Sequence, residues 1–278
     1  CRGTAQHVKV ALSGEGGDEV LGGYTRYFWG PLVDKLRPLM LPYAGDALAL
    51  AGLLPSHSLG VFNVARRVTK LAASLELDTP ARSLAWFDLF TADERRGLVR
   101  EGTGEGTDGA LARYQTLFDE ANGLGLDPVQ RMQYVDFQTM LLDNLLMKAD
   151  KISMAHSLEV RVPFLSAPLV EFGLGLPESQ KIGARQDKRL MRRLLRPRLG
   201  GRLANRPKRG FEIPVDRWFR EPATDSLRAQ LARGPLVTEL GFDATAIETL
   251  VRRHLGGEDI GRKLFALTSL ERWAQRFA

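Results

Sequence analysis

The chain has 278 residues, of which 44% are hydrophobic and 26% charged, which is the composition of an ordinary globular protein with one large or two modest domains. The single cysteine, Cys1, excludes an internal disulfide and suits a reducing cytoplasm, and the four scattered histidines lack the spacing of a zinc site. The net charge of +6 is small, and the most apolar stretch, around residues 39–54, is interrupted and too short to span a bilayer.

The first predicted element is a buried strand at residues 8–12, which leads through a glycine-rich turn into a helix. The glycines let the backbone come close to a ligand, and a helix start favours phosphate. The acids beside them would repel an anion, so they fit either a divalent cation held between them and phosphates, or a base. The alternative is a strand–turn–helix junction with a capping acid. The glycines are Gly14, Gly16 and Gly17, and the acids are Glu15, Asp18 and Glu19.

The next part of the chain, to about residue 98, has a helical pattern, with Thr91 as the N-cap of one helix. Residues 101–109 are rich in glycine and predict a surface loop. Asp127 and Pro128 then begin the strongest predicted helix, with the acid as N-cap. Asp143 interrupts the apolar run of this helix. It is exposed, paired or part of a polar cleft, because a short side chain cannot reach out of a core.

A change of pattern follows at residues 153–165, where Glu159 and Arg161 lie in an apolar stretch that ends at a proline. A half-buried ion pair that fixes the chain's exit from the helix explains them structurally. Residues 207–214 predict an exposed loop, Trp218 begins another helix, and residues 264–277 predict an amphipathic helix that packs on the rest.

A basic run extends from Arg185 to Arg209, with eleven basic residues and one acid, Asp187. The run would suit a polyanion, but it equally suits a solvated helix face. Asp187 is predicted to cap a helix, which puts Lys188 in the first turn, where N–H groups and an ammonium together favour phosphate.

Six segments, taken together and in order, resemble the synthetase domain of glutamine-hydrolysing asparagine synthetases. They extend over about residues 8–220, and the remaining residues add little. The segments are 12–19, 22–24, 148–155, 158–165, 188–195, and 208–211 with Pro214 and Trp218.

The resemblance implies an α/β parent fold, adenine nucleotide α-hydrolase-like and of the PP-loop ATP pyrophosphatase type. This chain would be predominantly α-helical and carry the last strand or strands of the parallel sheet, with residues 1–30 ending that sheet and 31–278 forming the helical portion. The family's glutaminase domain and phosphate-gripping loop are not in these residues, nor is a signal peptide or initiator methionine. We therefore expect a partial chain that alone neither binds ATP tightly nor forms asparagine, and Cys1 is not the family's nucleophile.

The resemblance also implies a reaction in which the side-chain carboxylate of aspartate attacks the α-phosphate of Mg-ATP. Ammonia from glutamine then displaces AMP. Glu15 would be the catalytic base, Asp18 would position Mg²⁺ or substrate, and Lys188 would stabilise charge on the phosphate or intermediate. Ser13, Gly14, Gly16 and Gly17 would shape the pyrophosphate and substrate wall, and Asp143 falls near an acidic position of the family.

Other functions stay open at this point. A related amidotransferase would activate another carboxylate, and a non-catalytic binding module would retain the fold without turnover. A nucleic-acid-binding domain would use the basic run, but that run has no aromatic residue before Phe211 on which bases would stack. We expect a cytoplasmic protein with neither nucleic acid nor a membrane as partner. The sequence leaves the oligomeric state open, a homodimer included.

Overall fold

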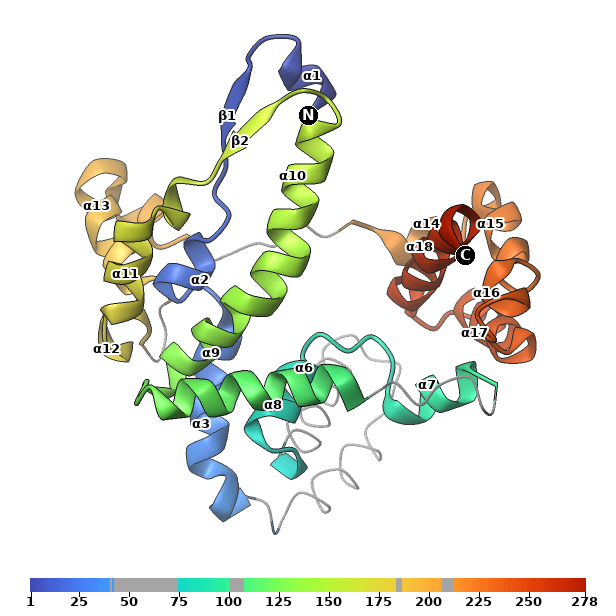
Figure 1. The fold of residues 1–278 in the computed structure, drawn as a ribbon, viewed down its shortest axis with the longest axis horizontal. Helices are drawn as coiled ribbons and strands as arrows, with labels where there is room; N and C mark the ends of the chain where they lie inside the picture. Colours follow the sequence, from blue (N-terminus) through green and yellow to red (C-terminus); the bar gives the residue numbers. More distant parts are fainter. Residues whose placement is uncertain (41, 43–74, 101–107, 184–186, 207–212) are drawn as a thin grey trace. The chain divides into compact units, whose positions relative to one another are not determined.

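The computed structural model describes residues 1–40, 42, 75–100, 108–183, 187–206 and 213–278. The described chain is mostly helical and contains a two-stranded parallel sheet (Figure 1). It divides into two compact units, the first made of Cys1–Ala85 and Leu111–Pro207 and the second of Trp86–Ala110 and Lys208–Ala278. The prediction of a largely helical chain with a remnant of parallel sheet is confirmed.

The first unit carries the sheet and most of the predicted site. Its first elements are α1 (Arg2–Ala5), β1 (Val10–Leu12), α2 (Gly17–Leu21), α3 (Thr25–Met40), α6 (Thr79–Ala85) and α8 (Asp108–Gly123). After these come α9 (Pro128–Asp136), the π-helix η2 (Phe137–Leu146), α10 (Met147–Met154), β2 (Glu159–Arg161), η3 (Pro163–Leu165), α11 (Ala167–Gly175), α12 (Glu178–Lys181) and α13 (Arg189–Ala204).

The predicted strand–turn–helix at the start of the chain is present as β1 and α2. β1 pairs in parallel with β2, and Ala11 lies opposite Val160. The prediction that the strand is buried is wrong for the described structure, because Leu12 is 74% exposed. Among the described residues β1 has β2 as its one sheet neighbour, whereas parallel strands are buried when further strands and helices cover them.

The strongest predicted helix is confirmed at its start. Asp127 accepts from the backbone N–H of Gln130, whose side chain accepts in turn from the N–H of Asp127. From Pro128 the chain stays helical through α9, η2 and α10 to Met154, a long rod in Figure 1. The apolar core beside α9 includes Tyr27, Phe118 and Val129.

The second unit is a cluster of short helices around its own apolar core, which includes Leu236, Ile247 and Leu264. Its elements are α7 (Ala92–Leu98), α14 (Val215–Trp218), η4 (Pro222–Thr224), α15 (Asp225–Leu231), α16 (Pro235–Thr238), α17 (Ala244–Leu255) and α18 (Gly261–Phe277).

Two predictions for the second unit are confirmed. The Thr91 side chain caps α7 in a reciprocal arrangement with Glu94, and α18 packs its buried face on the core. The prediction that Trp218 begins a helix is wrong. Pro214 starts the turn, so Trp218 is the last residue of α14.

The predicted loops fall mainly outside the described residues. Of the loop at 101–109, residues 101–107 are not described, and Asp108 and Gly109 belong to α8. Of the loop at 207–214, residues 207–212 are not described, and these include the 208–211 segment. None of the helices in the described ranges has both the length and the apolar character that crossing a membrane requires.

Candidate active site

Helix α2 is the point at which the predicted site segments meet. The turn before it packs on η3, which follows about 145 residues later. A Cβ on Gly16 would lie 2.2 Å from Leu165 Cδ2, and Gly16 also has a φ of +82°, a conformation that favours glycine. A Cβ on Gly17 would lie 3.3 Å from the Phe164 ring. Packing and backbone conformation therefore favour glycine at Gly16, and packing leaves little room for a side chain at Gly17.

An ion pair joins two predicted site residues that are 170 positions apart in the sequence. Lys188 Nζ lies 2.5 Å from Asp18 Oδ1, and the two side chains are 26% and 22% exposed. Gly23 makes room for this pair, because a Cβ there would lie 1.9 Å from Asp18 Oδ1 and 2.3 Å from Lys188 Cε. The segment at 22–24 thus lies at the same site as the segments at 12–19 and 188–195.

The route by which Lys188 reaches Asp18 differs from the prediction. Lys188 is not in the first turn of a helix. It precedes α13, in the left-handed conformation with φ 46°, and its backbone N–H faces Gly22 O at 3.4 Å. Lys188, not Asp187, occupies the N-cap position of α13. The Asp187 carboxylate is bound by the Arg192 guanidinium.

Glu15 lies in the turn between β1 and α2. Its Oε2 is buried and has no hydrogen-bond partner among the described residues. A buried carboxylate oxygen without a donor is costly, so this atom is suited to a proton, an amine or a cation that arrives with a ligand. Ser13 continues the sheet by donating its N–H to Arg161 O, and Gly14 is exposed, with no atom within 4 Å of an added Cβ.

Asp143 does not contact the Asp18–Lys188 pair in any interaction of the described residues. It lies on η2 and pairs with Arg113 at 3.2 Å, and both side chains are about half exposed. The sequence left three possibilities for Asp143, namely exposure, pairing or a polar cleft, and the structure shows that it is both exposed and paired. Glu159 and Arg161 do form the predicted ion pair, but on β2 and with both side chains more than half exposed, so the expected half-burial is wrong.

Several basic side chains of the run at 185–209 bind partners within the first unit. The Arg192 guanidinium binds Asp187 and also donates to the carbonyl oxygens of Ala204 and Arg206. Arg189 donates to Ser179 O. With Lys188 paired to Asp18, several of the described cations in this run have internal partners, which favours a structural explanation over a polyanion-binding face.

A buried polar network beneath α2 was not found from the sequence. The Tyr24 hydroxyl donates to Glu19 Oε1 at 2.7 Å, and burial raises the pKa of Glu19. Gln133 and Lys181, both almost fully buried, bind each other, and Gln133 also donates to the backbone of α2. The sequence held one indication of this network, a polar residue on an apolar helix face. Gln133 lies one helical turn from Val129, on the buried face of α9.

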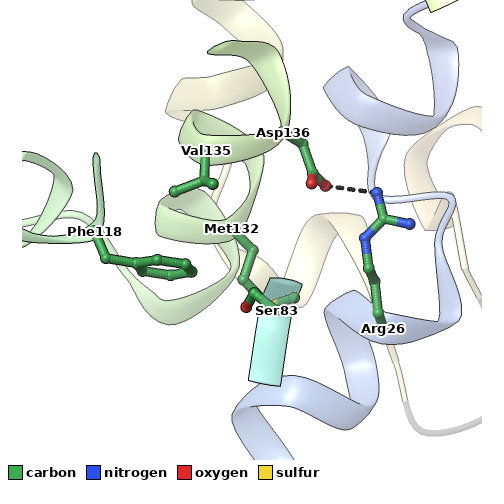
Figure 2. A pocket seen from close by; sticks show the side chains of 6 residues that line it. All are labelled: Arg26, Ser83, Phe118, Met132, Val135 and Asp136. Atoms are coloured by element: carbon green, nitrogen blue, oxygen red, sulfur yellow. Dashed lines mark hydrogen bonds and ion pairs between the residues drawn. The ribbon is translucent and has the colours of Figure 1, made fainter. Parts of the chain in front are cut away.

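A second buried cluster lies between α3 and α9. Asp136 accepts from Arg26 at 2.7 Å and from the Tyr27 hydroxyl at 2.5 Å. Figure 2 shows this carboxylate paired directly with the guanidinium at the side of a small pocket. The pocket is lined by Arg26, Ser83, Phe118, Met132, Val135 and Asp136, so none of the sequence-predicted site residues faces it.

Magnesium stays a prediction at this site. Within the described ranges no three His, Cys, Asp or Glu side chains gather as metal ligands. Mg²⁺ bound with a nucleotide needs only one or two carboxylates, since water and phosphate oxygens complete its shell. The Asp18 carboxylate therefore fits such an ion as its one protein ligand.

The space at Gly23 gives a direct test of the Asp18–Lys188 pair. We expect Gly23→Ala to lower the rate of the site's reaction by about 100-fold, because the added methyl displaces both side chains by about 1 Å. Gly123→Ala is the matched control, since a Cβ at Gly123 meets no atom within 4 Å. Steady-state rates of the two variants check this, and equal rates would show that the pair does not matter.

Lys181 gives a prediction for stability. Burial lowers its pKa from 10.5 to about 8. Between these values the unfolded chain holds a proton that the folded chain has released, so the free energy of unfolding rises with pH. Relative to Lys181→Met, the wild type should gain up to about 1.4 kcal/mol per pH unit. Urea unfolding at several pH values between about 7.5 and 10 measures this difference. A difference that is the same at every pH would contradict the assignment.

Comparison with known proteins supports one family. The family model described as asparagine synthase matches residues 1–275. A protein of Mycobacterium tuberculosis named putative asparagine synthetase [glutamine-hydrolyzing] is 33% identical over 98% of this chain and 40% of its own length. Asparagine synthetase [glutamine-hydrolyzing] 1 of Bacillus subtilis is 30% identical over 80% of this chain and 33% of its own length.

A relative with a different name also matches. Amidase chyE of Penicillium rubens is 26% identical over 92% of this chain and 39% of its own length. The chain thus spans about a third to two fifths of the length of these relatives. No solved structure gives a significant match. Since the family model extends over nearly all 278 residues, the chain belongs to the asparagine synthase family.

Proposed function

We propose that this chain is the C-terminal part of the synthetase domain of a glutamine-dependent asparagine synthetase, a cytoplasmic enzyme with a PP-loop type α/β fold. The glutaminase domain and the phosphate-gripping loop would lie in the remainder of the protein. One observation carries the proposal beyond family membership. Asp18 is expected to position Mg²⁺ or substrate and Lys188 to stabilise charge on the phosphate or intermediate, and the two form an ion pair at 2.5 Å although they come from distant segments.

The proposed reaction has two steps. Attack of the aspartate side-chain carboxylate on the α-phosphate of ATP forms an acyl-adenylate and releases pyrophosphate. Attack of ammonia, supplied from glutamine, then releases AMP and leaves asparagine. Both steps concentrate negative charge, so they need a fixed cation and a base beside the acyl carbon.

The residues of this chain divide these tasks. Lys188 holds its ammonium next to α2 and would transfer its contact from Asp18 to a phosphate oxygen when ATP binds. Asp18 would hold Mg²⁺, which when bound neutralises phosphate charge. The Glu15 carboxylate would take a proton from the attacking amine, since its buried Oε2 has no protein donor in the described part of the chain.

The test is an isotope experiment on the intact protein. Aspartate labelled with ¹⁸O in its side-chain carboxylate is incubated with ATP, Mg²⁺ and glutamine or ammonia. The proposal expects asparagine together with one labelled oxygen in AMP. Formation of ADP, or AMP without label, would contradict it.

A relative that activates another carboxylate is the second candidate, favoured by the match to a fungal protein named as an amidase. In that case aspartate would give no product, while a different carboxylic acid would drive release of AMP and pyrophosphate. A panel of carboxylates in the same assay separates the two candidates.

A further inference from the structure

A buried glutamine ties α2 to the rest of the first unit. Gln133, on α9, is 0% exposed. Its side-chain nitrogen donates to Glu19 O and, at 3.1 Å, to Val20 O. Its side-chain oxygen accepts from Lys181 Nζ at 2.7 Å. All the polar atoms of the amide are therefore used.

The orientation of this amide is fixed by its partners. A flipped amide would put its oxygen against two carbonyl oxygens and its NH₂ group against an ammonium, which is repulsive on both sides. Lys181 is itself held by a second acceptor, Leu174 O at 3.2 Å, and is 1% exposed. Lys181 thus determines how Gln133 faces α2.

Helix α2 depends on outside support because it has only five residues. A helix this short is not stable alone, and its last carbonyl groups have no partner within the helix. Gly23 N–H satisfies Asp18 O, and Gln133 satisfies the next two carbonyls. The base of the Lys181 side chain also packs here, since a Cβ on Gly22 would lie 3.0 Å from Lys181 Cβ.

The same short helix carries Asp18 on its first turn, opposite Lys188. We propose that Gln133, oriented by Lys181, is a positioning residue for the active site: it holds α2 so that Asp18 and Lys188 face each other. This inference rests on the proposed function, because the site it serves is the one assigned to ATP. Keeping an ammonium buried is costly, and burial lowers the pKa of Lys181, so an apolar residue would serve simple packing better.

The test uses the intact protein with ammonia, ATP and aspartate, and compares Gln133→Glu with Gln130→Leu. Gln133→Glu keeps an acceptor for Lys181 but removes both donors to α2. Gln130 is the matched control, because it lies on the same helix, donates to Leu174 O, and belongs to the cap of α9. Glutamine hydrolysis is measured in parallel as a check on the rest of the protein.

We expect Gln133→Glu to lower kcat for amide formation by about 10- to 100-fold, with KM for ATP and aspartate nearly unchanged. Gln130→Leu should lower the thermal midpoint but keep kcat. If Gln133→Glu does not fold, Lys181→Met loosens the same amide from its other side and should lower kcat in the same way. A kcat within about 3-fold of wild type in the folded variants would overturn the inference.

A second readout does not depend on the reaction. Hydrogen–deuterium exchange of residues 17–23 should be faster in Gln133→Glu than in wild type and unchanged in Gln130→Leu. Absence of amide formation by the wild type would refute the proposed function alone. Unchanged hydrogen–deuterium exchange in Gln133→Glu would refute the proposal that Gln133 holds α2 in position, whatever the activity.

Discussion

Glu15→Gln should slow amide formation by about two to four orders of magnitude while leaving the protein folded. The substitution keeps the size of the side chain and removes its ability to accept a proton. Glu15 Oε2 has no hydrogen-bond partner among the described residues, so the exchange of an oxygen for an NH₂ group breaks no contact of the described fold. Rapid-quench assays of asparagine formation in the intact protein measure the effect.

Comparing the two steps of the reaction in Glu15→Gln distinguishes a base in the second step from a general structural role of Glu15. Exchange of labelled pyrophosphate into ATP should persist in Glu15→Gln, because activation of the carboxylate precedes the attack by ammonia. Glu171→Gln is the control, since Glu171 is an exposed glutamate on α11 in the same unit. Wild-type amide formation by Glu15→Gln would remove Glu15 from its proposed role.

Lys188→Ala should lower both pyrophosphate exchange and amide formation, each by about 100- to 1000-fold. The reason is that the ammonium beside α2 would stabilise charge on the phosphates in the first step, which the second step requires. Parallel assays of the two reactions measure this. Lys35→Ala, which removes an exposed lysine from α3, is the control and should behave like wild type.

A double variant separates two explanations of that loss. If Lys188 serves only to neutralise Asp18, then Asp18→Asn combined with Lys188→Ala should be as active as Asp18→Asn alone, because no unpaired carboxylate remains in either variant. If Lys188 acts on the phosphates, the double variant should be less active than Asp18→Asn alone. Equal activity of these two variants would therefore contradict the assigned role of Lys188.

Local chemistry made part of the fold predictable. Asp127 before a proline and Thr91 before two acids have few alternatives to capping a helix, and both caps are present. The glycine-rich turn between β1 and α2 was likewise visible in the sequence. β2 was not predicted, because three residues are too few to show an alternation, and its pairing with β1 depends on contacts about 150 residues away.

The candidate site was predictable only as a set of segments. Similarity to a family suggested that Asp18 and Lys188 act together, but not how they meet. Lys188 reaches Asp18 from a left-handed residue before α13, which no helix pattern signals. Lys181 lies in a polar stretch that resembles a surface turn, and its burial comes from the packing of α12 near α2. Tertiary contacts of this kind have no local signature.

A crystal structure of the intact protein with Mg²⁺ and α,β-methylene-ATP would test the central claim most directly. We predict that Lys188 Nζ leaves Asp18 and lies about 3 Å from a phosphate oxygen, with the Glu15 carboxylate lining the same cavity. A triphosphate bound elsewhere, with Lys188 still paired to Asp18, would contradict the account.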